Sequence, residues 1–61
     1  MNRISAETLA KQHGGRCYWS QSELMHVIVR SDGHEFRINR EMLTFLNAVE
    51  FRRRYLEIPP A

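Results

Sequence analysis

The spacing of apolar residues predicts a short helix near the start of the chain. Ser5 is a favourable helix N-cap, and glycine often ends a helix because it can adopt a left-handed conformation. The sequence therefore predicts a helix over about residues 5–13 that stops at Gly14-Gly15. Ile4 and Leu9 have the spacing of a hydrophobic staple around this N-cap.

β-Branched and aromatic residues dominate the middle of the chain and predict a small antiparallel sheet. An aromatic pair favours a strand over residues 16–19, and two further apolar runs favour strands over 24–30 and 34–38. The last two runs are separated by Asp32-Gly33, a strong short-range signature of a β-hairpin. We expect two or three strands, with the last two joined by a tight turn.

A two-residue loop at Asp32-Gly33 would fix the pairing of the hairpin strands. The predicted pairs are Arg30 with Glu35, Val29 with Phe36, Ile28 with Arg37, and Val27 with Ile38. Because paired residues share a face of the sheet, the predicted core face carries Met25, Val27, Val29, Phe36 and Ile38. The predicted outer face carries Leu24, His26, Ile28, Arg30, Glu35 and Arg37, and it is open to solvent or to a partner.

The last part of the chain predicts one longer helix. Asn39 can cap a helix over about residues 40–56, and Pro59-Pro60 prevents its continuation, so residues 57–61 are expected to form a tail. Helical spacing places one apolar stripe on the hairpin, made of Met42, Phe45, Leu46, Val49 and Leu56. A second, displaced stripe consists of Ala48, Phe51 and Tyr55.

These elements together predict a single α+β domain over residues 1–61. It has a short N-terminal helix, a small antiparallel sheet and a C-terminal helix packed on the sheet. A domain of this size buries only about 60% of the surface of its unfolded chain. Its stability is therefore expected to be marginal, and a partner subunit would increase it.

Charge and cysteine content narrow the expected setting of the protein. Nine basic and seven acidic side chains give a net charge of +2, which is small for a protein that coats nucleic acid. The single cysteine, Cys17, cannot form an internal disulfide and favours a reducing compartment, the cytoplasm. The polar N-terminus and the absence of a long apolar run predict a protein that is neither exported nor membrane-spanning.

The residues that most often carry chemistry are scattered along the sequence. His13 and Cys17 could pair on a helix, but Gly14-Gly15 interrupts it, and His26 and His34 lie elsewhere. Structural zinc sites usually need four ligands in close pairs, and a nucleophilic cysteine needs a base held by a third group. We therefore predict no metal site, no cofactor, no catalytic residue and no enzymatic activity.

The surplus of apolar surface favours a protein that acts by binding another protein. The predicted partner-binding residues are Ile28, Arg30 and Arg37 on the outer hairpin face, and Phe51 and Tyr55 in the second helical stripe. The predicted function is a small regulatory or inhibitory protein, of the kind that phages and other mobile elements encode. The same surfaces could instead join two copies in a homodimer.

Nucleic-acid binding is the alternative function. Nearly all of the basic residues are arginine, which suits bidentate contacts to phosphate. The residues that would contact phosphate are Arg30, Arg37, Arg52, Arg53 and Arg54. A helix-turn-helix made of residues 5–13 and 22–29 is not expected, because the connection between them is too long for the turn of that motif.

Overall fold

Three antiparallel strands form the base of the molecule, and short helices pack on one of their faces. The computed structural model describes residues 1–60 and has the expected α+β fold. The elements in chain order are α1 (Arg3–Gln12), β1 (Arg16–Ser20), β2 (Met25–Val29), β3 (Glu35–Ile38), α2 (Arg40–Phe45), α3 (Ala48–Phe51) and a π-helical turn, η1 (Arg52–Leu56). The strands lie in the order β1-β2-β3.

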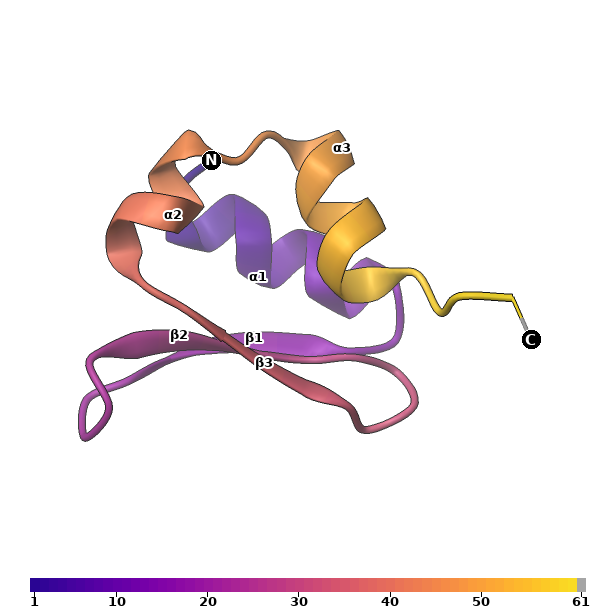
Figure 1. Cartoon of the computed structure of the whole chain (residues 1–61), viewed down its shortest axis with the longest axis horizontal. Helices are drawn as coiled ribbons and strands as arrows, with labels where there is room; N and C mark the ends of the chain where they lie inside the picture. The colour runs from indigo at the N-terminus through magenta and orange to yellow at the C-terminus, as the bar shows by residue number, and fades with distance from the viewer. Residues whose placement is uncertain (61) are drawn as a thin grey trace.

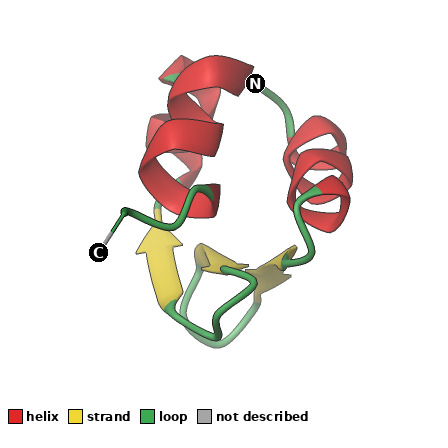
Figure 2. Cartoon of the chain, turned by 90° about the vertical axis from the view of Figure 1, so that its right-hand side faces the viewer, coloured by secondary structure: helices red, strands yellow, loops and turns green. Residues whose placement is uncertain are grey.

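The helices lie together on one side of the sheet (Figure 1). Seen from the end, α1 rises on one side and the C-terminal helices rise on the other, with the sheet below both (Figure 2). The core fills the space between them and consists of Ala6, Ala10, Cys17, Ile28, Ile38, Leu43, Leu46, Phe51, Tyr55 and Leu56. Among residues 1–60, no helix lies on the opposite face of the sheet.

Each of the three asparagines in the sequence caps a helix. The Asn2 side chain accepts a hydrogen bond from the Ser5 amide at 2.8 Å, so α1 begins at Arg3 and the expected cap at Ser5 is wrong. Ile4 is 76% exposed and forms no hydrophobic staple. Asn39 caps α2 as predicted.

The register of the hairpin differs by one residue from the prediction. The structure pairs Val29 with Glu35, Ile28 with Phe36, Val27 with Arg37, and His26 with Ile38. The loop has three residues, because Arg30 N–H donates to the His34 carbonyl and Gly33 N–H donates to the Arg30 carbonyl, both at 2.8 Å. Gly33 has a φ of +91°, the left-handed conformation that three-residue hairpin loops require.

A shift of one residue exchanges the two faces of a strand. Ile28 and His26 therefore lie on the helix-covered face, opposite Cys17 and Trp19 of β1. Val27 lies on the open face, between Tyr18 and Arg37, and is nevertheless fully buried. Phe36 and Ile38 pack with the core as predicted, whereas the prediction for β2 is reversed.

The expected single helix over residues 40–56 is broken at Leu46. Leu46 has an extended backbone, with φ −78° and ψ 145°, and Asn47 caps a new helix by accepting a hydrogen bond from the Glu50 amide at 2.9 Å. The side-chain Nδ2 of Asn47 also donates to the Glu50 carboxylate at 3.0 Å, which adds a second hydrogen bond between the cap and the first turn of α3. The break changes which residues face the core after this point.

Beyond η1, residues 58–60 have no regular structure, and the end of the expected tail, Ala61, lies outside the described residues. Within residues 1–60, no helix has the length and apolar character needed to cross a membrane.

Candidate functional site

Three of the predicted partner-binding residues belong to the core. Ile28 and Phe51 are fully buried, and Tyr55 is 9% exposed. The ring centroids of Phe51 and Tyr55 are 5.7 Å apart, and Tyr55 also packs on Phe36 at 5.3 Å. The one-residue shift in register accounts for Ile28, and the helix break accounts for the two aromatic residues. In this fold, none of the three presents a free surface to a partner.

The other two predicted residues, Arg30 and Arg37, lie on opposite faces of the sheet. The Arg30 guanidinium donates two hydrogen bonds to the Asp32 carboxylate, both at 2.7 Å, and lies over the Phe36 ring. This contact lowers the pKa of Asp32 to about 2. Arg37 bonds Glu23 at 2.6 Å and Glu35 at 3.1 Å on the open face. The two arginines therefore form no common patch.

The arginine run in η1 is also largely paired with carboxylates. Arg52 contacts Glu57 at 3.1 Å, and Arg54 contacts Glu50 at 3.4 Å. Among the described residues, no ion pair is formed by Arg53, which is exposed. Four of the five arginines expected to contact nucleic acid thus already have acidic neighbours.

An exposed apolar surface lies on α2 and α3, where the sequence predicted core. Phe45 is 86% exposed, Val49 is 46% exposed and Met42 is 41% exposed; we call these three residues the α2–α3 apolar surface. A groove of about 370 Å³ runs past Met42 and Phe45. Its polar lining consists of Asn39, Glu41, Glu50 and Arg54.

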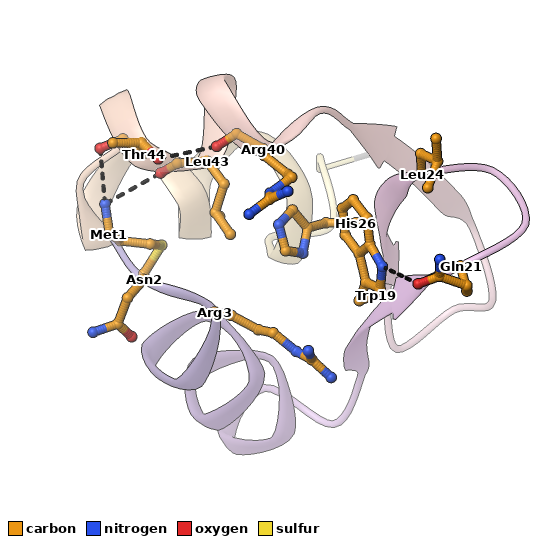
Figure 3. Close-up of a pocket in the computed structure, with 10 residues that line it drawn as sticks. All are labelled: Met1, Asn2, Arg3, Trp19, Gln21, Leu24, His26, Arg40, Leu43 and Thr44. Carbon is orange, nitrogen blue, oxygen red and sulfur yellow. Dashed lines mark hydrogen bonds between the residues drawn. The ribbon is translucent and has the colours of Figure 1, made fainter.

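A second hollow, of about 510 Å³, lies where the start of α1 and α2 approach the end of the β1–β2 hairpin. Its lining consists of Met1, Asn2, Arg3, Trp19, Gln21, Leu24, His26, Arg40, Leu43 and Thr44. Arg40 extends from α2 toward the His26 ring, and Arg3 extends from α1 and ends below Trp19 in this view (Figure 3). We call this hollow the Arg3–Arg40 pocket.

The backbone holds the rim of this pocket in place through several contacts. The Met1 amino group donates to the carbonyl oxygens of Leu43, Thr44 and Leu46 at 3.1, 3.1 and 2.7 Å, which ties the start of the chain to the end of α2. Leu24 has a φ of 55°, an unfavourable value for a residue with a side chain of this size. Its side chain is 61% exposed at the pocket edge.

His26 is the buried polar residue of the pocket. It is 6% exposed, and its ring lies edge-on to Trp19 with the centroids 4.9 Å apart. Within the described structure, its Nδ1 atom is buried without a hydrogen-bond partner. Burial lowers the pKa of His26, and the positive charges of Arg3 and Arg40 lower it further, while Glu7 opposes them. The imidazole is therefore neutral at pH 7.

Cys17 has the environment of a structural thiol. It is 5% exposed, and burial, assisted by the Glu7 charge, raises its pKa to about 11. A thiol with this pKa carries almost no thiolate at neutral pH. Among residues 1–60, no three side chains of the metal-binding types lie together.

In comparisons with known proteins, no family model, no curated protein and no solved structure matches the chain. Sequence reasoning missed both hollows for the same reasons that it misplaced the core. The β1–β2 register pairs His26 with Trp19, and the three-residue loop pairs His26 with the core residue Ile38. The capping pair Asn47 and Glu50 was the signal that could have revealed the exposed position of Phe45.

Proposed function

We propose that the protein is a small, non-enzymatic regulator that acts by binding another protein through the α2–α3 apolar surface. The observation that supports this most strongly is Phe45, a large aromatic side chain that is 86% exposed. Complete burial of a phenylalanine side chain contributes about 1.5–3 kcal/mol. Phe45 is therefore well suited to be an anchor that becomes buried when the partner binds.

The surroundings of Phe45 fit a protein interface. Met42 adds a flexible side chain, which adapts well to the shape of a partner. Glu41, Glu50 and Arg54 give the groove a charged edge. An apolar centre with a polar rim is the usual composition of a protein-binding patch, and charged rims favour selected partners over others.

Nucleic-acid binding through the arginines is less well supported. Arg30, Arg37, Arg52 and Arg54 contact carboxylates and are divided among different faces. Phosphate groups would have to compete with those carboxylates at each of these four arginines. The two functions also differ in their response to salt, because phosphate contacts weaken steeply with added salt and apolar contacts do not.

Phe45→Glu tests the proposal, because it places a charge at the centre of the surface without removing any core atom. Ser22→Glu is the matched control, since Ser22 is an exposed neutral residue in the β1–β2 turn. We expect wild-type protein and Ser22→Glu to form the same salt-resistant complex, and Phe45→Glu to lose it. Light scattering of the purified proteins identifies a homodimer, and co-purification from the native host identifies a different partner.

Circular dichroism provides the folding control, since Phe45→Glu is expected to keep the wild-type spectrum. A folded Phe45→Glu that retained every complex of the wild type would contradict the proposal. So would a complex that dissociated in 1 M salt.

A further inference from the structure

The charged side chains in the lining of the Arg3–Arg40 pocket are all basic. Two guanidinium groups line it, and no described residue in its lining is acidic. Arg40 lies over the Trp19 ring, 5.6 Å from its centroid, and forms no ion pair with a described carboxylate. Arg3 contacts Glu7 through Nε at 3.0 Å. The positive charge of the lining therefore favours binding of an anion.

The His26 imidazole gives the second and independent indication of a ligand. A buried nitrogen without a hydrogen-bond partner is costly, and each such group in a native protein needs an explanation. His26 is only 6% exposed, and it lines the same hollow as the two arginines. Because Nδ1 itself is buried in the free protein, an oxyanion in the pocket could accept a hydrogen bond from Nδ1–H after the imidazole ring rotates toward the hollow.

The remaining lining residues indicate more than a simple ion. Trp19 and Leu24 offer aromatic and apolar surface, and the Gln21 and Asn2 side chains offer amide groups. Arginine guanidinium groups match phosphate oxygens in bidentate geometry, and aromatic side chains bind nucleobases by stacking. The volume of about 510 Å³ lies within the range of small-ligand sites.

We propose that the Arg3–Arg40 pocket binds the terminal phosphate of a nucleotide, with Arg3, Arg40 and His26 contacting the phosphate and Trp19 and Leu24 contacting the base. The phosphate is supplied either by a free mononucleotide or by the 5′ end of a single strand, since both present the same group. This site is separate from the α2–α3 apolar surface. It uses Arg40, Leu43 and Thr44 of α2, whereas the groove at that surface uses Met42 and Phe45.

The site gives His26 a characteristic response to its ligand. Three charged groups act on the free imidazole: Arg3 and Glu7 of α1, and Arg40 of α2. A bound anion adds negative charge beside the ring and favours the imidazolium form. The pKa of His26 should therefore rise when the pocket is occupied. Sulfate is a suitable probe for this measurement, because it remains fully ionised over the pH range in which histidine titrates.

The experiment is an NMR titration of the whole chain that follows the His26 ring signals. The probes are sulfate, adenosine, adenosine 5′-monophosphate, and a short single-stranded oligonucleotide with and without a 5′-phosphate. We expect sulfate to raise the pKa of His26 and the mononucleotide to bind at least tenfold more tightly than adenosine. Preference for the mononucleotide or for the phosphorylated strand identifies the source of the phosphate.

Two pairs of variants separate a specific site from general charge attraction. Arg40→Gln should weaken mononucleotide binding at least tenfold, the loss of a charge-assisted contact, while Arg53→Gln, which alters an exposed arginine outside the pocket, should leave it unchanged. Leu24→Gly should weaken the mononucleotide more than sulfate without unfolding the chain, because glycine adopts a φ of 55° readily. Phe45→Glu should bind the mononucleotide as the wild type does.

The proposal is overturned if neither sulfate nor the mononucleotide moves the His26 signals. Equal losses of mononucleotide affinity in Arg40→Gln and Arg53→Gln would also overturn it. Such a result would indicate general electrostatic attraction and no specific binding site. Oligonucleotide binding that ignored the 5′-phosphate would contradict terminal-phosphate recognition.

Discussion

The exchange of core and surface positions along the C-terminal helices can be tested with two matched substitutions. Phe51 is fully buried, whereas Phe45 is 86% exposed. Leucine has three fewer side-chain carbons than phenylalanine, and each buried carbon contributes about 0.8 kcal/mol. Phe51→Leu should therefore lower the free energy of unfolding by roughly 2–3 kcal/mol, including part of the cavity that it leaves.

This loss is large relative to the whole stability of the domain. A chain of 61 residues has an expected free energy of unfolding of roughly 3–9 kcal/mol. Phe45→Leu removes the same atoms from an exposed position and should change the stability by no more than about 0.5 kcal/mol. The pair thus compares one chemical change in two environments.

Urea denaturation followed by circular dichroism provides the measurement. It should be made at low protein concentration, because association would stabilise the wild type and exaggerate the effect at Phe45. A stability loss at Phe45 equal to or larger than that at Phe51 would refute the broken-helix arrangement. That result is what an uninterrupted helix over residues 40–56 predicts.

Three further predictions concern local structure. Asn47→Ala should destabilise the fold by about 1 kcal/mol through loss of the α3 cap, and unchanged or increased stability in urea would instead indicate a continuous helix. Gly15→Ala should cost about 1–3 kcal/mol, because the added Cβ would overlap the carbonyl oxygen of Val29; a wild-type melting temperature would contradict this packing. The carboxyl carbon of Asp32 should titrate by NMR with a pKa of about 2 and return toward 3.8 in Arg30→Gln; a pKa unaffected by this substitution would exclude the ion pair as its cause.

The pH dependence of stability gives a prediction for His26. Its pKa in the folded protein is below the ordinary value of 6.5, so the unfolded chain binds the proton more readily. The contribution of neutral His26 to stability is fully present above pH 6.5 and is lost as the pH falls through the lowered pKa. Between pH 7 and pH 5, the wild type should therefore lose more stability than His26→Gln. Equal losses in urea titrations of the two proteins would contradict this assignment.

Sequence reasoning succeeded where local signals and tertiary structure agree. The glycine pair after the first helix, the hairpin at Asp32-Gly33 and the cap at Asn39 are recognisable from residue type alone. They were sufficient to predict an α+β domain with two or three antiparallel strands and helices at both ends. None of these signals depends on which face of an element is buried.

The candidate sites depend on which face of each strand or helix is buried. A shift of one residue in strand pairing exchanges the buried and exposed faces. Asp32-Gly33 is compatible with loops of two or three residues, and the choice between them decides whether His26 and Ile28 point toward the helices. In the C-terminal segment, the capping preference of Asn47 outweighs the continuous apolar pattern around it. The hairpin register and the helix break both depend on packing against the rest of the domain. The sequence of a single strand or helix does not contain that information.

The two proposed surfaces share α2 but use different sides of it. Phe45 and Met42 belong to the protein-binding surface, and Arg40, Leu43 and Thr44 belong to the phosphate pocket. Arg40→Gln and Phe45→Glu should therefore act independently: the first weakens mononucleotide binding, and the second prevents partner binding. A nucleotide that altered partner binding would couple the sites through this short helix.

The most direct test of protein binding is site-specific photo-cross-linking in the native cell. A photoreactive phenylalanine analogue is placed at position 45 or, as the control, at the exposed Ser22. The account predicts a discrete adduct from position 45 and none from position 22, with an adduct of twice the monomer mass if the partner is a second copy. The absence of any adduct from position 45, or the same adducts from both positions, would contradict binding through the α2–α3 apolar surface.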